Sequence, residues 1–205
     1  MSLDPLILRS MIATAAERLI ASADELTSLD QAIGDGDHGL NMKRGCEQVL
    51  AELDAIAAKP TAKALKAVGM ALVMKVGGAS GPLYGSLFMG MGKKLGERPA
   101  TMELLPEVFA AGVEAVAARG KSTAGEKTML DVLTAVLKTM RSDERIRAEP
   151  LREAAVLGAT STIPMRATKG RASYLGERSV GHMDPGARSS QILIEALSTY
   201  LESRP

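Results

Sequence analysis

Three aspartates crowd into a short segment that glycines can bend. Asp30, Asp35 and Asp37 fall within eight residues, and His38 follows directly. Carboxylates this close together repel one another unless a hard cation or a set of backbone amides absorbs their charge. Mg²⁺ suits such a set, because it usually completes its coordination with water and substrate phosphates. The sequence therefore predicts a magnesium site, and the alternative is a solvated acidic turn in which Asp37 caps a helix.

The same segment contains two patterns that belong to other sites. A calcium loop of the EF-hand type that starts at Asp35 needs a glutamate at its twelfth position, where this chain has Cys46. The G-x-G-x-x-G pattern from Gly34 to Gly39 matches a dinucleotide fingerprint, but that motif follows a buried strand and offers bare amides to a pyrophosphate. Here a mixed segment precedes the glycines, and two carboxylates occupy the intervening positions. Both of these sites are therefore rejected.

A second segment, from Gly77 to Pro82, is rich in small residues. Small residues let backbone N–H groups approach an anion, and a proline suits the first turn of a following helix. Because helix N-termini bind phosphate, this segment is a candidate phosphate cradle. Taken alone, it is equally consistent with a tight turn between helices. Paired with the acidic segment, it would supply the second half of a magnesium–nucleotide site.

A third segment, from Thr168 to Arg188, is expected to be irregular, because it holds four glycines in a polar setting. Loops of this length in compact domains are usually functional. Its charged and titratable residues include two arginines, whose guanidinium groups match phosphate oxygens. The residues in question are Arg171, Arg178, His182 and Asp184. The segment is a candidate cover for a nucleotide pocket, and the alternative is a polar surface loop.

The elements expected to position these segments are helices, because apolar residues recur at helical spacing in eight stretches. The first stretch follows Asp4 and Pro5, which suit an N-cap and a first helical turn. The others are expected at 39–57, 61–76, 82–95, 102–119, 127–141, 150–168 and 188–202. Short connections between them favour antiparallel neighbours. We therefore expect an all-α fold with eight helices in an up-and-down arrangement, in one domain.

The composition agrees with a helical protein and excludes several classes of partner. The 205 residues include twelve Met but only two Phe, three Tyr and no Trp, whereas long β-sheets favour aromatic and β-branched residues. A formal net charge of +1 supplies no basic field for a nucleic-acid backbone. The single cysteine, Cys46, can form no internal disulfide, which fits a reducing cytosol, and it is expected to be a packing residue.

No segment predicts export or membrane insertion. The first twenty residues carry scattered charges, so the apolar core of a signal peptide is missing. The longest uncharged run, 76–92, is interrupted by six glycines and a proline, which makes it a poor membrane span. We expect a cytoplasmic protein that has neither a membrane nor a nucleic acid as partner.

Five blocks of the sequence resemble the L subunit of the dihydroxyacetone kinase family, its nucleotide-binding half. They read GDGDHGLNM at 34–42, GGASGPLYG at 77–85, EKTMLD at 126–131, GRASYLGERS at 170–179 and GHMDPGA at 181–187. The blocks span nearly the whole chain, although Glu126 stands where the family often has Asp and Ala79 where some members have Ser. The resemblance implies an eight-helix antiparallel barrel with ADP or ATP at one end, and one nucleotide-binding domain over residues 1–205.

The resemblance also implies roles for individual residues. Two Mg²⁺ ions would be held by Asp30, Asp35 and Asp37 and would bridge to the nucleotide phosphates. The phosphates would be contacted by His38, Gly39, Leu40, Asn41, Ala79 and Ser80. The adenine would lie near Gly120 and Met129, although a Met at helical spacing is more often a core residue. The pocket would be closed by Arg171, Asp184, Pro185 and Gly186.

By the same resemblance, this chain is one half of an active site. A separate K subunit would bind the keto-sugar covalently through a histidine, and transfer would be positional and metal-assisted, with no single catalytic residue assigned here. The phosphoryl donor stays open between ATP and a phosphohistidine carrier protein, as do the keto-sugar, with erythrulose the nearest alternative, and the oligomeric state, including a homodimer. A different class of function is a nucleotide-loaded interaction module that reports to a transcription regulator.

Overall fold

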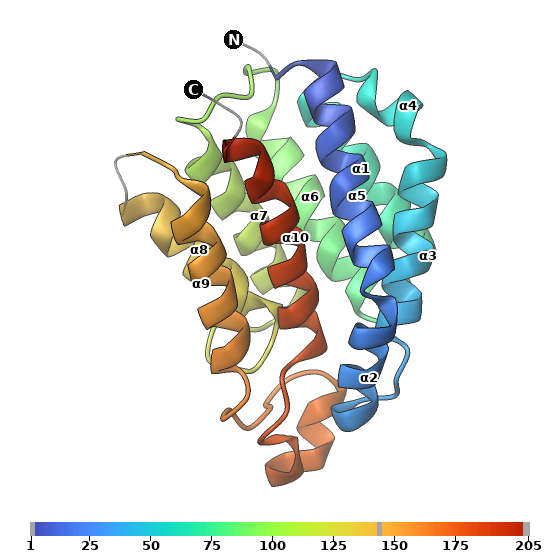
Figure 1. Cartoon of the computed structure of the whole chain (residues 1–205), viewed down its shortest axis with the longest axis vertical. Helices are drawn as coiled ribbons and strands as arrows, with labels where there is room; N and C mark the ends of the chain where they lie inside the picture. The colour runs from blue at the N-terminus through green and yellow to red at the C-terminus, as the bar shows by residue number, and fades with distance from the viewer. Residues whose placement is uncertain (1–2, 143–144, 203–205) are drawn as a thin grey trace.

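The computed structural model describes residues 3–142 and 145–202, and all regular structure in these ranges is helical. Ten α-helices and one 3₁₀-helix, labelled η1, follow one another along the chain (Figure 1). They are α1 (Pro5–Ala21), α2 (Ala23–Ile33), α3 (His38–Ala51), α4 (Leu53–Ala57), α5 (Thr61–Lys75), α6 (Ser80–Leu95), α7 (Leu105–Gly120), α8 (Met129–Ser142), α9 (Ala148–Ser161), η1 (Arg171–Ser179) and α10 (Pro185–Glu202). The expected all-α class is confirmed.

The expected number of eight helices is wrong, because three further helices occur. Helix α2 was missed because its buried positions include Asp30, so that a carboxylate interrupts the apolar stripe that marks a helix in sequence. The stretch 39–57 divides near Glu52 into α3 and the short α4. The glycine-containing segment expected to be irregular forms η1, with a kink at Gly176, and the first turn of α10. The stretch expected at 150–168 is helical only to Ser161.

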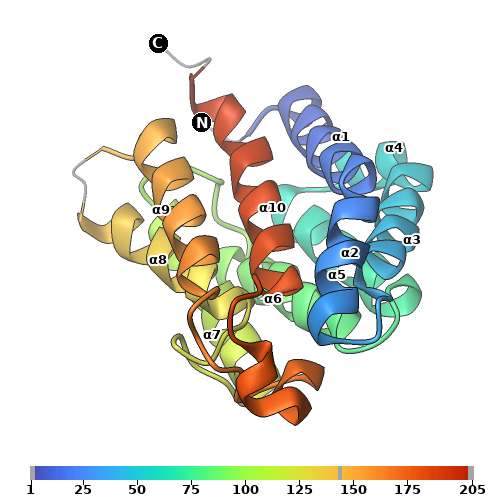
Figure 2. The same ribbon diagram turned by 60° about the horizontal axis from the view of Figure 1, so that its bottom comes forward.

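The eight longest α-helices, which leave out the shorter α2 and α4, form a closed ring. Each packs against the next in the order α1, α3, α5, α6, α7, α8, α9 and α10, and α10 packs back against α1 (Figures 1 and 2). Apolar side chains from all eight helices meet inside the ring in one core. Cys46 lies in this core, and burial raises the pKa of its thiol to about 12, so it is the packing residue that the sequence predicts.

Close backbone contact joins α5 to α6. A Cβ atom added at Gly69 would lie 2.8 Å from the carbonyl oxygen of Gly85, and one added at Gly85 would lie 2.9 Å from the carbonyl oxygen of Gly69. Larger residues would push these helices apart, because backbone carbonyl oxygens, which cannot move aside as a side chain can, lie against both positions. This contact fixes the position of the short loop between α5 and α6, which belongs to the site described below.

Every second connection of the ring lies at the same end. The connections that follow α2, α5, α7 and α9 all contribute residues to one pocket. Consecutive long helices therefore run in opposite directions, and the pocket lies at the end of the ring where Figure 1 shows α2 and the segment that contains η1. Within the described residues, no helix combines the length and apolar character that crossing a bilayer requires.

Candidate functional site

The pocket at this end of the ring has a volume of about 510 Å³. This lies within the range of ordinary small-molecule sites, which is roughly 300–1,000 Å³. Twelve of the fifteen residues expected at a nucleotide and metal site line it. These are Asp30, Asp35, Asp37, His38, Ala79, Ser80, Gly120, Met129, Arg171, Asp184, Pro185 and Gly186. Segments that are far apart in sequence thus form a single cavity.

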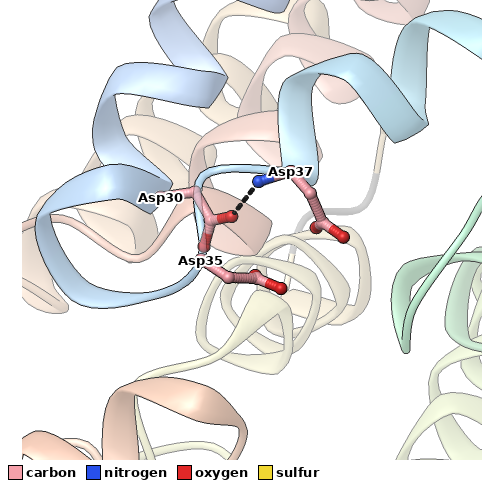
Figure 3. Close-up of side chains that lie close together, drawn as sticks. All are labelled: Asp30, Asp35 and Asp37. Carbon is pink, nitrogen blue, oxygen red and sulfur yellow. Dashed lines mark hydrogen bonds between the residues drawn. The ribbon is translucent and has the colours of Figure 1, made fainter.

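The three predicted metal ligands come together. One oxygen from each of Asp30, Asp35 and Asp37 lies within 4.8 Å of the others, from the last turn of α2, the loop after it and the start of α3 (Figure 3). Asp30 is buried, and its Oδ2 accepts hydrogen bonds from the backbone amides of Asp37 at 2.8 Å and of His38 at 3.1 Å. A Cβ at Gly34 would lie 2.1 Å from Asp30 Oδ1, so the loop can close around this carboxylate only with glycine there.

The chemistry of this cluster fits a hard divalent cation. All three side chains offer carboxylate oxygens, which Mg²⁺ prefers. Asp35 faces a positive group, the Nη2 of Arg171, at 3.0 Å. Within the described part of the chain, the carboxylate of Asp37 forms no hydrogen bond or ion pair, so its oxygens are available to a ligand.

His38 is buried beside the acidic cluster, and both of its ring nitrogens are engaged. Nδ1 lies 2.9 Å from the Oγ of Ser80, and Nε2 lies 2.9 Å from the Oγ of Ser189, which is 2.7 Å from the hydroxyl of Tyr84. Desolvation lowers the pKa of His38 below its ordinary value, although Asp30 and Asp37 oppose this shift. A neutral imidazole thus links the starts of α3, α6 and α10.

Four helices begin at the pocket. The N-termini of α3, α6, α8 and α10 contribute His38, Ser80, Met129 and Pro185 to its lining. The unpaired N–H groups and the dipole of a helix N-terminus favour negative charge. The loop before α6 turns at Gly78, whose φ of 64° is a conformation that glycine adopts without strain. The pocket therefore pairs a carboxylate cluster suited to a cation with four anion-favouring helix ends.

Three residues that were expected to contact phosphate do not line the pocket. Gly39 packs against α2, because a Cβ there would lie 1.9 Å from the carbonyl oxygen of Ala23. The side chain of Leu40 is half exposed. Asn41 is buried against the loop before α6, with its Oδ1 2.7 Å from where a Cβ of Gly77 would be. These residues form the packing behind the pocket.

The candidate residues of the third segment, 168–188, are divided between the pocket and the surface. Arg171 and Asp184 line the pocket, whereas Arg178 and His182 are exposed and lie outside its lining. Burial raises the pKa of Asp184 to about 7, because desolvation outweighs the backbone N–H of Ala187 and the charge of Lys127. Its Oδ2 accepts the Ala187 amide at 2.7 Å and so completes the first turn of α10.

Sequence inspection did not single out Lys127, which is buried and lines the pocket. It stands in a tight loop that Asp131 organises, since the two oxygens of Asp131 accept the amides of Gly125 at 2.5 Å and Thr128 at 2.7 Å. The T-x-x-D spacing from Thr128 to Asp131 is that of a helix cap and could have placed the start of α8. No residue type in the sequence could have shown that a lysine is buried there.

A family model described as the DAK2 domain matches residues 32–199. The chain belongs to the DAK2 domain family. A relative from Listeria innocua, the ADP-binding subunit DhaL of PEP-dependent dihydroxyacetone kinase 1, is 45% identical over 181 residues, which cover 88% of this chain and 89% of the relative. The ADP-binding subunit DhaL of the Escherichia coli PEP-dependent kinase is 44% identical, with 86% and 87% covered.

The DAK2 chain also has a close match in fold among solved structures. The dihydroxyacetone kinase of C. freundii, in complex with AMP-PNP and Mg²⁺, superposes with a TM-score of 0.78 at 24% identity. The match covers 98% of this chain but 35% of the kinase chain, so the chain spans about a third of that larger protein. At this level of identity the superposition establishes the shared fold.

Proposed function

We propose that this DAK2 chain is the ADP-binding subunit of a dihydroxyacetone kinase and that residues 1–205 work as one nucleotide-binding domain, an antiparallel helical barrel with the nucleotide at one end. The observation that carries the proposal is the convergence of three carboxylates and four helix N-termini on one pocket. Carboxylates alone would repel a diphosphate, and helix ends alone would not hold a metal. The relatives named for ADP binding match over nearly their whole lengths.

The acidic cluster is the proposed metal site. Asp30, Asp35 and Asp37 would hold two Mg²⁺ ions, which supply positive charge to the phosphates when bound. The chain itself fixes one member of this set, because two backbone amides orient the carboxylate of Asp30. Asp35 and Asp37 carry the remaining ligand oxygens.

The residues around the cluster would bind and orient the nucleotide. The start of α6, with Ala79 and Ser80, faces the phosphates, and His38 holds the Ser80 hydroxyl in place through Nδ1. Gly120 and Met129 line the part of the pocket proposed for the adenine. Phosphoryl transfer needs little more than such positioning and charge stabilisation, so no covalent role is assigned to a side chain of this subunit.

The complete reaction needs partners. A K-type subunit would present the dihydroxyacetone hydroxyl to the terminal phosphate, and a phosphohistidine carrier would supply the phosphoryl group. The names of the most similar relatives, which describe kinases dependent on PEP or the PTS, favour this donor over free ATP. A D-erythrulose kinase and an L-erythrulose 1-kinase are 35% and 33% identical, less than the 45% and 44% of the DhaL subunits, so dihydroxyacetone is the preferred substrate.

A direct test begins with the purified chain and no partner. We expect ADP to be released on denaturation and identified by mass analysis, and Mg-ADP to raise the melting temperature because it binds the folded state. Asp35→Asn should lose both effects while its helix content stays normal. Retention of ADP by this variant in the presence of a chelator would contradict the metal assignment.

The second arm of the test measures transfer of the phosphoryl group. The chain should support phosphorylation of dihydroxyacetone only with a K-type subunit and a phosphohistidine carrier. A chain that retains ADP and supports no transfer with these partners would instead be an interaction module that reports nucleotide state.

A further inference from the structure

Lys127 is a buried cation at the edge of the pocket to which the proposed reaction assigns no task. It is 1% exposed, and its backbone φ is 62°. Lysine is almost never fully buried unless it is paired, and a positive φ is uncommon for a residue with a side chain. Two unfavourable features at one position indicate that contacts made by this residue compensate for them.

The ammonium group joins two points of the chain that lie far apart in sequence. Nζ donates a hydrogen bond to the carbonyl oxygen of Thr162 at 2.5 Å and another to the carbonyl oxygen of His182. Thr162 directly follows α9, and His182 lies shortly before α10. One side chain therefore holds both ends of the segment 162–182, which contains η1.

A second set of hydrogen bonds brings the same two ends together. The amide of Asp184 donates to Thr162 Oγ1 at 3.1 Å, and the amide of Gly181 donates to the carbonyl oxygen of Ile163 at 2.8 Å. Between these ends, the segment carries Arg171 to the pocket, and just after them comes the start of α10. The closed base of the segment thus sets the position of both.

The surroundings of Lys127 favour a fixed ammonium group. Burial lowers the pKa of Lys127, and the nearby carboxylates of Asp184 and Asp131 oppose that shift. Two carbonyl oxygens and two carboxylates thus surround one cation. Removing the cation would break both of its hydrogen bonds, and the Thr162 carbonyl oxygen would keep only the amide of Met165, at 3.2 Å.

We propose that Lys127 is a positioning residue for nucleotide retention: it holds the two ends of the segment 162–182 together so that Arg171 and the N-terminus of α10 stay at the pocket. This inference rests on the proposed nucleotide site. It assigns to Lys127 an effect on how long the nucleotide stays bound, through the segment that covers it.

The test compares the same substitution at two lysines of one loop. Lys127→Met removes the ammonium and keeps a stem of similar shape, whereas Lys121→Met changes an exposed lysine that also has a positive φ. We expect Lys127→Met to speed the release of fluorescently labelled ADP, with Mg²⁺ present, by about ten-fold or more. Amide exchange at Gly181 and Asp184 should accelerate, while exchange in α5 and α6 should not. Lys121→Met should match the unaltered chain.

Lys127→Arg separates a hydrogen-bonding role from simple space filling. Arginine restores a cation and donors, whereas methionine resembles the lysine stem more closely in shape. We expect the Arg variant to release ADP more slowly than the Met variant. Release from the Met variant that equals release from the unaltered chain, or is slower than from the Arg variant, would overturn the proposal.

Thr162→Val gives an independent measurement if the Lys127→Met chain does not fold. It removes the acceptor for the Asp184 amide and leaves the buried cation in place. Exchange at Asp184 and release of ADP should both become faster, and no change in either would count against the proposal. If the proposed function is wrong, the unaltered chain will not bind Mg-ADP. Amide exchange would in that case still show how the segment 162–182 is held.

Discussion

The guanidinium of Arg171 lies 3.0 Å from the carboxylate of Asp35 and links η1 to the loop between α2 and α3. Asp35 is also a proposed metal ligand, and a cation bound there would compete with Arg171 for its negative charge. Both side chains are well exposed, so the ion pair is weak and easily exchanged. The same arginine can then turn to the phosphates that arrive with the metal.

Arg171→Gln should therefore act in opposite directions on two ligands. Without nucleotide, the apparent affinity for Mg²⁺ should rise by about two- to five-fold, because a competing charge is gone. With nucleotide, the affinity for Mg-ADP should fall. Isothermal titration calorimetry measures both, and Arg178→Gln, an exposed arginine of the same 3₁₀-helix, is the control. A change of both affinities in the same direction would contradict the idea that Arg171 moves from Asp35 to the phosphates.

The three aspartates should differ in their effect on stability. Asp30→Asn should lower the free energy of unfolding by about 1–3 kcal/mol, because a buried carboxylate accepts two backbone amides. Asp35→Asn should change it by less than about 0.5 kcal/mol, since that side chain is at the surface and its ion pair with Arg171 is a weak one. Urea denaturation with a chelator present checks this. All three Asn variants, Asp37→Asn included, should lose metal-dependent ADP retention, and equal stability losses would contradict the assignment.

Asp184 should make the stability of the nucleotide-free chain depend on pH. Its pKa is raised to about 7 in the native state, whereas in an unfolded chain it titrates near its ordinary value of about 4. Between these values the native state binds the additional proton, so the contribution of Asp184 to the free energy of unfolding falls as the pH rises and is constant above pH 7. Asp184→Asn should remove this slope.

Urea denaturation of both chains at a series of pH values isolates the contribution of Asp184. The stability of the Asn variant relative to the unaltered chain should increase from about pH 4 to about pH 7 and then level off. Taking the difference removes the opposite slope that His38 produces, since its lowered pKa makes the native state bind fewer protons below its ordinary value. Parallel curves would show that Asp184 titrates normally.

Gly39→Ala tests the close packing of Gly39 against α2. Its Cβ would overlap the backbone of α2 at Ala23 and Thr27, so the free energy of unfolding should fall by about 1–3 kcal/mol. Leu40→Ala, at the half-exposed neighbour, should cost less than about 1 kcal/mol. Thermal denaturation compares the two, and similar melting temperatures would contradict close packing of α2 against α3.

The chain alone should not phosphorylate dihydroxyacetone at any concentration of ATP. The chain has two histidines; His38 has both ring nitrogens engaged, and His182 lies outside the pocket lining. Neither is placed to bind a keto-sugar beside the phosphates. A coupled assay on highly purified protein measures this, with added K-type subunit as the positive control. Formation of sugar phosphate without a partner, abolished by Asp37→Asn, would contradict the interpretation that this chain supplies only half of the active site.

The sequence revealed the long helices that obey simple periodicity and missed α2, which buries a carboxylate. The long helices follow their apolar stripes, and Asp4 caps α1 as expected, with its carboxylate accepting the Leu6 amide at 2.7 Å. Helix α2 was hidden because Asp30 occupies a buried position whose partners are amides that only the folded loop supplies. Spacing can predict regular packing but not such local compensation.

The site shows the same division. The clustering of the three aspartates could be predicted because they fall within eight residues, and the start of α6 because its glycines and proline mark a turn. Gly39, Leu40 and Asn41 lie outside the pocket lining although they directly follow His38, because each further residue along a helix points in another direction. Lys127 was invisible because its partners are backbone carbonyl oxygens, which no residue type identifies.

The contact between α1 and α10 has a consequence for how the site assembles. Because the first and last helices of the ring are neighbours, the ring is closed by the two most distant parts of the chain. During synthesis, the acidic loop emerges long before Asp184, Pro185 and Gly186, which also line the pocket. Contacts of such large sequence separation form late and slow the folding of a chain. A ribosome-bound chain that has not yet released α10 would thus have its proposed metal ligands and no enclosed pocket. Nucleotide binding would therefore begin only after the whole ring has been translated.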